Sequence, residues 1–277
     1  MIVHLLDGTY ELFRHFYGLR RFKKTDPPFG AVSGVLRTVV QMLEEGATHI
    51  GVATDHVIES FRNELWPGYK TSAGMERALL AQFQPLEESL LAMGVVVWPM
   101  VELEADDALA SAAFLAARNK RVEKVCIWTP DKDLGQSVVG DRVVQIDRRS
   151  NQIRDAAGVR DKFGVDPEFI PDYLALVGDA ADGYPGIKGC GSKTAANLIN
   201  RYGHIEKFPA EVFQDNNRVL ALLFKDLATL RTNAPLFKNV EELRWKGPMD
   251  SFAAVAKQID DPRLAERVQK LVAPVKG

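Results

Sequence analysis

The sequence predicts an α/β fold, in which a mostly parallel sheet is flanked by helices, followed by a helical C-terminal region. Two observations lead to this prediction. In the first half, short apolar runs alternate with longer segments of helical periodicity, which is typical of strands joined by crossover helices. After about Ser150 the β-branched runs stop and only helical patterns follow. We therefore expect an α/β region over residues 1–155 and a helical region over residues 156–277.

The expected strands are short apolar runs bounded by polar residues. Runs of this kind are typical of strands that are buried on both faces of a parallel sheet. They cover residues 2–6, 49–54, 95–101, 124–129 and 142–146. Apolar residues three or four positions apart indicate helices between these runs, at residues 34–46, 79–94 and 107–119.

The second region shows helical periodicity without intervening strands. Its helices are expected at residues 167–179, 193–203, 217–232 and 262–272. A glycine-rich stretch separates the first two of these segments. A helix, a tight connection and a second helix are therefore expected there.

Composition excludes several classes of protein. The 277-residue chain has two cysteines, Cys126 and Cys190, without the Cys/His spacing of a zinc site. The chain begins directly with an expected strand, and no apolar run approaches the length that crosses a bilayer. We therefore expect a soluble, intracellular protein without membrane contact. The net charge of −2 disfavours nucleic acid as a partner, unless the acidic residues gather at one place.

Acidic side chains follow four of the expected strands. The seven residues in these positions are Asp7, Asp55, Glu104, Asp106, Asp107, Asp131 and Asp133. Because ligands bind outside the carboxyl ends of the strands in an open parallel sheet, all seven groups are expected near one crevice. Each residue taken alone also fits a turn or a helix N-cap, Asp106 and Asp107 above all. Their repetition at four strands favours a shared site.

A carboxylate-rich site without histidine or cysteine selects hard cations. Mg²⁺ or Mn²⁺ fits a shell that water and substrate phosphate complete. Two such ions about 4 Å apart activate a water and stabilise the leaving oxygen in phosphodiester hydrolysis. The histidines lack metal-ligand spacing and are interpreted as structural: His4, His15, His49, His56 and His204.

A metal-dependent phosphatase is the competing class of enzyme. Phosphatases of the aspartyl-phosphate type need a second aspartate two residues after the first. In this chain Thr9 stands two residues after Asp7, which weakens that interpretation.

The stretch GDAADGYPGIKGCGSKTAANLI, residues 178–199, is rich in glycine. It nearly matches a phosphate loop, but Ser192 stands where the lysine is required and Lys193 comes one place late. The segment before it has helical rather than strand periodicity, so we expect no nucleotide cofactor. Two interpretations fit: a hairpin whose free N–H groups near Ser192 favour an anion, and a plain helix-to-helix turn.

Six ordered motifs resemble those of the 5′-nuclease family: LLDGTYELFRHFYGL, SFRNELWPGYK, EADDALAS, TPDKDL, LVGDAADGYPGIKGCGSKTA and LRTNAPL. That family includes the 5′-nuclease domain of bacterial DNA polymerase I, phage 5′-exonucleases and the flap endonucleases. The resemblance covers most of the chain, in a stand-alone form. It implies a PIN-like core, a helix–three-turn–helix motif, and Mg²⁺-dependent cutting of DNA as a 5′-3′ exonuclease or flap endonuclease with two or more ions.

The resemblance also implies roles for individual residues. The family's metal-site positions correspond to Asp7, Asp55, Glu104, Asp106, Asp107, Asp131, Asp133, Asp179 and Asp182. Its basic residues at the scissile phosphate correspond to Arg14, Arg62 and Lys70. Its duplex-gripping hairpin, often with bound K⁺, corresponds to Gly186, Lys188, Gly189, Gly191, Ser192 and Lys193.

The implied partner is DNA with a junction of single and double strands, or an RNA–DNA hybrid, bound by a monomer. Asp179 and Asp182 are three residues apart, so both face one way if the preceding helix continues through them. Apart from the nine carboxylates at the implied site, the chain is net positive, which suits a polyanionic partner.

The sequence departs from the family pattern at three positions. Ala73 stands where an arginine is common, Gly135 replaces a tyrosine, and Gly183 replaces an asparagine. These changes leave the acidic set intact and bear on substrate preference. Two rival functions remain: a protein that binds branched nucleic acid without cutting it, and a PIN-type ribonuclease. The first gains nothing from nine clustered carboxylates, and the second needs neither the glycine hairpin nor a second acidic pair.

Overall fold

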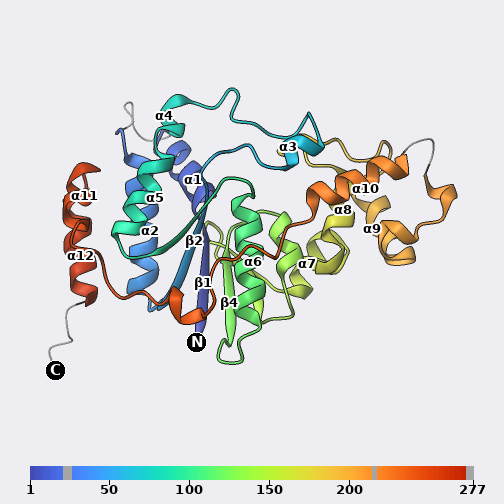
Figure 1. The fold of residues 1–277 in the computed structure, drawn as a ribbon. Helices are drawn as coiled ribbons and strands as arrows, with labels where there is room; N and C mark the ends of the chain where they lie inside the picture. The colour runs from blue at the N-terminus through green and yellow to red at the C-terminus, as the bar shows by residue number, and fades with distance from the viewer. Residues whose placement is uncertain (21–26, 214–216, 273–277) are drawn as a thin grey trace.

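The computed structural model describes residues 1–20, 27–213 and 217–272, and these form a six-stranded sheet in the order β3-β2-β1-β4-β5-β6 (Figure 1). Strands β1 to β5 pair in parallel, whereas β6 pairs antiparallel with β5. The predicted α/β class with a mostly parallel sheet is confirmed. The strands span Ile2–Asp7 (β1), His49–Asp55 (β2), Val96–Met100 (β3), Lys124–Trp128 (β4), Val143–Asp147 (β5) and Gln152–Arg154 (β6).

The strand order reverses between β1 and β4. These two strands are neighbours at the centre of the sheet, although the chain passes through β2 and β3 between them. The carboxyl edge at such a switch point is where open parallel sheets bind ligands. Asp7 ends β1 there, and Thr129 follows the end of β4 on the same edge.

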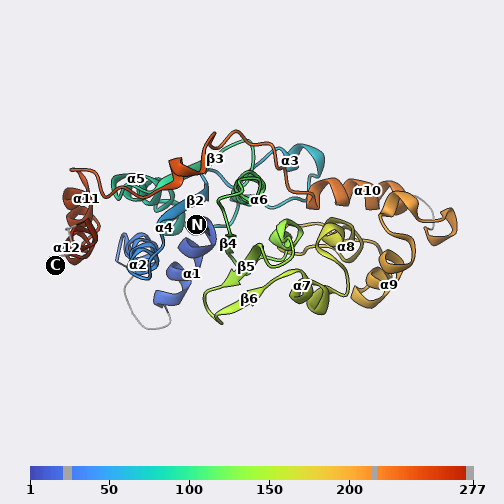
Figure 2. The same cartoon turned by 90° about the horizontal axis from the view of Figure 1, so that it is seen from below.

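Helices cover both faces of the sheet (Figure 1, Figure 2). Alternate side chains of β1 point to opposite faces, so Leu6 belongs to one core while Val3 and Leu5 belong to the other. The helices that share a core with Leu6 are α1 (Gly8–Arg20), α2 (Gly30–Glu44), α4 (Arg77–Leu80), α5 (Phe83–Ala92), α11 (Phe252–Gln258) and α12 (Pro262–Val272). Helix α6 (Ala105–Ala117) packs on the opposite face through its alanines.

The segment between β2 and β3 is more broken than its periodicity suggests. The helix expected at residues 79–94 is two helices, α4 (Arg77–Leu80) and α5. Pro85 lies in the first turn of α5, where its missing N–H would have no helical partner in any case. A short helix, α3 (Arg62–Leu65), comes earlier in this segment.

The helical region has a core of its own, at the end of the molecule that lies opposite α11 and α12 (Figure 2). Its helices are α7 (Ala156–Phe163), α8 (Ile170–Val177), α9 (Ser192–Tyr202) and α10 (Asn217–Ala228). Short 3₁₀ turns connect the longer elements: η1 (Asp133–Ser137), η2 (Pro167–Phe169), η3 (Ile205–Lys207), η4 (Ala210–Val212) and η5 (Val240–Leu243). Among the described residues, no helix is long and apolar enough to cross a membrane. The division of the chain at residue 155 stays a prediction, because α11 and α12 pack against α2 and α5 of the first region.

Candidate active site

Carboxylates from separate elements meet at the carboxyl edge of the sheet. Asp7 is 5% exposed, and its two oxygens accept hydrogen bonds from the Tyr10 N–H at 2.8 Å and the Thr129 hydroxyl at 3.0 Å. Burial, and then the charges of Asp55 and Asp131, raises the pKa of Asp7 to about 7. Like charges held this close favour either a proton or a bound cation.

Asp55 and Asp106 come from the neighbouring elements of the same edge. Asp55 ends β2, and its Oδ1 accepts a hydrogen bond of 2.8 Å from the N–H of Ala105, which fixes the first turn of α6. Burial raises the pKa of Asp55. Burial, and then the charges of Asp131 and Asp7, raises the pKa of Asp106 well above its ordinary value. Four elements that are distant in sequence thus place carboxylates within electrostatic reach of one another.

Asp131 lies between β4 and η1, and Asp133 is the first residue of η1. The N–H of Asp133 donates to Asp131 Oδ1 at 2.9 Å. Asp133 is 6% exposed, and its own Oδ1 is buried without a hydrogen-bond partner in the part of the chain that the structure describes. Burial, and then the charges of Asp131, Asp182 and Asp179, raises the pKa of Asp133 well above its ordinary value. A buried carboxylate oxygen without a partner is a donor atom suited to a cation.

Asp179 and Asp182 belong to a tight turn, not to a helix. Helix α8 ends before Gly178, whose φ of 88° is in the region that favours glycine. The helix therefore does not continue through both aspartates, and the helix expected at residues 167–179 ends at Val177. The N–H groups of Gly183 and Tyr184 both donate to the Asp179 carbonyl, at 2.9 and 3.0 Å, and close the turn.

Gly183 in this turn is required by a close approach of two backbones. Its φ is 84°, and a Cβ at this position would lie 1.9 Å from the carbonyl oxygen of Gly68. An asparagine would therefore clash here, which explains the departure at this position. The indole N–H of Trp66 also donates to the Gly183 carbonyl at 3.0 Å. The turn is thus fastened to the segment that follows α3.

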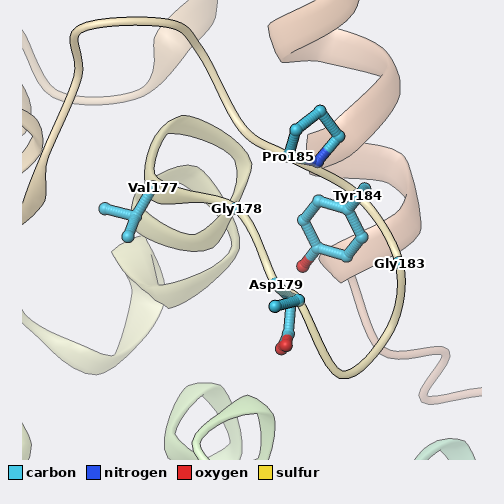
Figure 3. Close-up of a pocket in the computed structure, with 7 residues that line it drawn as sticks. Val177, Gly178, Asp179, Gly183, Tyr184 and Pro185 are labelled. Carbon is cyan, nitrogen blue, oxygen red and sulfur yellow. The ribbon is translucent and has the colours of Figure 1, made fainter.

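Asp133, Asp179 and Asp182 can serve as ligands to one ion, because they offer carboxylate oxygens within 4.8 Å of one another. Such an all-oxygen set fits a hard divalent cation. The Tyr184 hydroxyl is also buried without a partner among the described residues. Figure 3 shows this hydroxyl directed toward Asp179, and the charges of Asp133, Asp182 and Asp179 add to burial in raising the pKa of Tyr184. One ligand comes from the α/β region and two come from the helical region.

Two lysines of the α/β region contact the aspartates of the turn. Lys132 Nζ lies 2.7 Å from Asp179 Oδ2, and Lys70 Nζ lies 3.0 Å from Asp182 Oδ1 and 2.8 Å from Glu104 Oε2. Burial opposes the charge of Lys70, but the charges of Asp182 and Glu104 raise its pKa well above its ordinary value. Sequence reasoning missed Lys132, although its place inside the TPDKDL motif is a usable signal.

Asp107 and Arg62 form a buried ion pair instead of facing the other carboxylates. The two Nη atoms of Arg62 lie 2.7 and 2.8 Å from the Asp107 oxygens, which also accept from the N–H groups of Glu104 and Arg231. Arg62 Nε donates to the Leu227 carbonyl at 2.7 Å. The metal role predicted for Asp107 and the phosphate role predicted for Arg62 do not fit these contacts, because no Asp107 oxygen is left for an ion. The pair joins α6 to the end of α10.

Glu104 contacts residues that surround the carboxylate cluster. Its Oε1 accepts from the Ser60 hydroxyl at 2.6 Å and lies 3.1 Å from Arg62 Nη1, while its Oε2 contacts Lys70 and the Tyr69 hydroxyl. Burial would raise its pKa, but the charges of Lys70 and Arg62 hold that pKa below its ordinary value. These contacts engage both oxygens and position Lys70.

Arg14 lies in α1, two turns from Asp7. Its Nε and Nη2 bond to the two carboxylate oxygens of Glu11, and Nη2 also contacts His15 and Thr38. The structure therefore places Arg14 beside α2 and does not bring it into the carboxylate cluster.

The predicted hairpin residues lie in the connection between α8 and α9 and in the first turn of α9. Gly186 is buried where the hairpin crosses α8, since a Cβ there would lie 2.4 Å from the N atom of Gly178. The other five are exposed to solvent: Lys188, Gly189, Gly191, Ser192 and Lys193. Helix α9 begins at Ser192 without a side-chain cap, so its first N–H groups are open to an anion.

His56 directly follows Asp55, but its Nδ1 lies 2.7 Å from Glu87, which is not one of the predicted metal ligands. His204 alone lies in a group with metal-ligand geometry among the described residues, together with Asp172 and Glu206. Lys225 Nζ already lies 2.8 Å from each of these carboxylates, so a cation occupies the centre of that group. The arrangement is an ion-pair network at the edge of the helical core, in which Asp172 is buried and Glu206 is exposed.

Carboxylates gathered at the switch point of a parallel sheet, next to a hairpin open to anions, define a hydrolase of phosphodiester bonds. The chain belongs to the 5′-3′ exonuclease family. Residues 2–164 match its N-terminal resolvase-like domain, and residues 165–251 match its C-terminal SAM fold. The predicted family is confirmed.

Curated relatives include stand-alone and fused forms. A 5′-3′ exonuclease of Aquifex aeolicus (strain VF5) is 31% identical over 281 residues, which cover 97% of this chain and 96% of the relative. The DNA polymerase I of Pseudomonas aeruginosa is 33% identical over 259 residues, which cover 86% of this chain and 28% of the polymerase.

Solved structures share the fold at low sequence identity. The bacteriophage T5 D15 flap endonuclease, in a complex with DNA and metal ions, superposes with a TM-score of 0.63 at 19% identity, covering 98% of this chain and 99% of that one. The catalytic core of Rad2 in complex with DNA substrate gives a TM-score of 0.61 at 15% identity, covering 97% and 91%.

Proposed function

We propose that this chain is a structure-selective nuclease that depends on divalent metal and hydrolyses DNA near the junction of single and double strands. The observation behind the proposal is the meeting of Asp133 with Asp179 and Asp182 beside the edge that holds Asp7 and Asp131. A protein that only binds nucleic acid gains nothing from this cluster, because carboxylates repel phosphates.

Two Mg²⁺ or Mn²⁺ ions would be held by the carboxylates that converge on this edge. The proposed ligands are Asp7, Asp55, Asp106, Asp131, Asp133, Asp179 and Asp182. When bound, such ions lower the pKa of a water and stabilise the leaving oxygen of an in-line displacement. Asp107 is left out of this set because Arg62 and two N–H groups occupy its oxygens. Glu104 is also left out of the set, and its proposed role is to position Lys70.

Lys70 is the cation placed to contact the reacting phosphate. Its side chain is 30% exposed, while Glu104 and Asp182 hold its ammonium group beside the carboxylates. A fixed cation at this position stabilises the charge that develops on the phosphate in the transition state. Arg62, which is 1% exposed, acts as a positioning residue for α6.

The hairpin is proposed to hold the backbone of duplex DNA, with K⁺ bound at its backbone groups. Lys193→Ala should weaken binding to duplexes of every sequence alike and lower the salt slope by about one unit. Lys120→Ala, at an exposed position outside the hairpin, is the matched control. Replacing K⁺ with tetramethylammonium at equal ionic strength should weaken duplex binding by the unmodified chain. Unchanged affinity and slope for Lys193→Ala in Ca²⁺ would count against this interpretation of the hairpin.

The proposed partner is DNA inside the cell, bound by a single copy of the chain without a nucleotide cofactor. Both the carboxylates and the hairpin belong to one chain, so the proposed site is complete in a monomer. An RNA–DNA hybrid presents the same phosphates and is a second substrate to compare.

The test is a cleavage assay on labelled flap, nicked, single-stranded and hybrid substrates, with Mg²⁺ or with EDTA. We expect cleavage at the junction of the flap and nicked substrates in Mg²⁺, and none in EDTA. Tight binding without cleavage in Mg²⁺ would instead support the non-cleaving function. Cleavage confined to single-stranded RNA would support the ribonuclease function. Full cleavage in excess EDTA would contradict the role of the metal.

A further inference from the structure

Helix α5 carries a buried carboxylate that does not belong to the predicted metal site. Glu87 is 5% exposed and stands in the apolar stripe of α5, between Phe83 and Leu90. In the part of the chain that the structure describes, no lysine or arginine pairs with it. Burial of a carboxylate costs free energy unless hydrogen bonds replace those to water. The contacts of Glu87 must therefore explain why a charged residue stands where an apolar one would fit.

Both oxygens of Glu87 contact the end of β2. Oε1 accepts a hydrogen bond of 2.9 Å from the hydroxyl of Thr54, which is 3% exposed, and Oε2 lies 2.7 Å from His56 Nδ1. These two residues stand on either side of Asp55, which is a proposed metal ligand. One side chain of α5 therefore holds the chain just before and just after that ligand.

The side chain of Asp55 points away from Glu87, toward the opposite face of the sheet. Successive side chains of a strand alternate between its two faces. Thr54 and His56 face α5, whereas Asp55 Oδ1 accepts from the N–H at the start of α6. Glu87 therefore has no contact with the carboxylate of Asp55, and it can affect this ligand only through the two neighbouring residues.

Thr54 also contacts the start of α1. A Cβ on Gly8, which directly follows Asp7, would lie 2.8 Å from Thr54 Cγ2. The threonine that Glu87 holds is therefore packed against the residue next to a second proposed ligand. Asp7 and Asp55 repel each other, since the charge of Asp55 disfavours the ionised form of Asp7. A fixed end of β2 resists this repulsion before an ion binds.

We propose that Glu87 is a positioning residue for the metal ligand Asp55, whose carboxylate it keeps directed at the ions by holding Thr54 and His56. This inference rests on the proposed function, because it assumes that Asp55 binds metal. Removal of a partner that orients a metal ligand typically lowers metal affinity by about 10- to 100-fold. Glu87 acts through the residues beside the ligand, so we expect the lower end of that range.

The test compares Glu87→Leu with Glu87→Gln. Leucine fills the position in the core but removes both contacts with β2. Glutamine can keep both, because its amide oxygen accepts from Thr54 and its amide N–H donates to His56 Nδ1 when that atom carries no proton. Glu88→Gln, at the exposed neighbouring position in α5, is the control. Mn²⁺ binding is measured by titration with electron paramagnetic resonance, and stability is measured by chemical denaturation in EDTA.

We expect Glu87→Leu to weaken Mn²⁺ binding by about 10-fold. Its stability in EDTA should stay equal or rise, because an apolar side chain replaces a buried charge. The Mg²⁺ concentration for half-maximal single-turnover cleavage should rise by about the same factor. Glu87→Gln and Glu88→Gln should match the unmodified chain in Mn²⁺ affinity.

Thr54→Val provides a second test that does not place a new side chain in the core of α5. Valine keeps the shape of threonine and removes only one of the two contacts of Glu87. We expect Mn²⁺ binding to weaken by about threefold, because His56 still holds the chain after Asp55. This variant decides the question if Glu87→Leu does not fold.

Unchanged Mn²⁺ affinity of folded Glu87→Leu would overturn the proposal, and any loss of stability would then show a purely structural role. Equal losses of Mn²⁺ affinity in Glu87→Leu and Glu87→Gln would also overturn it, because the charge would matter and not the two contacts. Mn²⁺ binding and cleavage by the unmodified chain are scored separately. If the unmodified chain shows neither, the proposed function itself fails, which distinguishes that result from a failure of Glu87 alone.

Discussion

The two groups of carboxylates in the site are balanced in different ways. The strand-end group consists of Asp7, Asp55, Asp106, Asp131 and Asp133, and its hydrogen bonds come chiefly from N–H groups and a hydroxyl. The turn pair, Asp179 and Asp182, instead contacts lysines of the other region, at 2.7 and 3.0 Å. The strand-end group is held in position by the sheet and the elements next to it. The turn pair is held beside that group by ion pairs with lysines.

This difference assigns separate tasks to the two regions. The sheet gathers the strand-end group because the carboxyl ends of parallel strands meet at one edge. Burial and mutual repulsion raise the pKa values of Asp7, Asp106 and Asp133, so this group is short of positive charge. Lys70 and Lys132 supply charge to the turn pair and also join the helical region to the sheet. In the proposed function, these contacts link the carboxylates that hold the metal to the region that holds the duplex.

The largest expected effect is on turnover when the strand-end group loses a charge. Asp131→Asn should lower single-turnover cleavage by about a thousandfold or more, because the ions lose a ligand charge. Stability in EDTA should stay equal or rise, because repulsion is relieved. Asp141→Asn, at an exposed position between β4 and β5, is the control. If Asp131→Asn cleaves at the rate of the unmodified chain, the reaction does not take place at this group of carboxylates.

The next effect separates structural charge from catalytic charge. Arg62→Ala should lower the free energy of unfolding by about 3 kcal/mol or more, because it leaves Asp107 buried without its partner. Chemical denaturation of the purified variant measures this. Arg62→Met combined with Asp107→Leu should regain part of the loss. If Arg62→Ala has normal stability but cleaves slowly, Arg62 contacts the reacting phosphate and its role is catalytic rather than structural.

The two lysines offer the sharpest comparison of the two groups. Lys70→Ala should slow single-turnover cleavage by roughly 100-fold, with a smaller effect on DNA binding, because it removes a cation from the reacting phosphate. Lys132→Ala should slow cleavage less, by about 10-fold, because Lys132 contacts Asp179 and only positions it. Equal losses from both substitutions would show that the lysines share one task.

The smallest effect concerns the buried hydroxyl of Tyr184. Tyr184→Phe should raise the free energy of unfolding in EDTA by about 1 kcal/mol, because it removes a hydroxyl that has no partner among the described residues. Its ring contact with Phe224, at a centroid distance of 5.5 Å, is kept. A loss of stability in EDTA would mean that the hydroxyl already has a partner in the metal-free protein.

The acidic residues of the strand-end group were predictable from the sequence, because apolar runs show where the strands end. Asp7 and Asp55 come directly at the end of an apolar run and Asp131 comes three residues after one, and parallel strands bring such positions together. The start of α9 at Ser192 was also predictable from its periodicity. The antiparallel strand β6 was not, because its three residues are too few to show a pattern.

The remaining features depend on contacts between distant segments. Nothing in the EADDALAS motif distinguishes Asp106, which faces the cluster, from Asp107, which pairs with Arg62. The turn after α8 depends on the approach of Gly183 to Gly68, which the sequence does not reveal.

The central claim is that carboxylates of the two regions complete one metal site. Counting bound Mn²⁺ by titration, with free Mn²⁺ followed by electron paramagnetic resonance, tests it without any cleavage. The unmodified chain should bind two Mn²⁺ ions, as a two-metal site requires, and so should Asp141→Asn. Asp179→Asn combined with Asp182→Asn should bind one. If the double variant keeps both ions at unchanged affinity, the helical region does not contribute to the site and the account is contradicted.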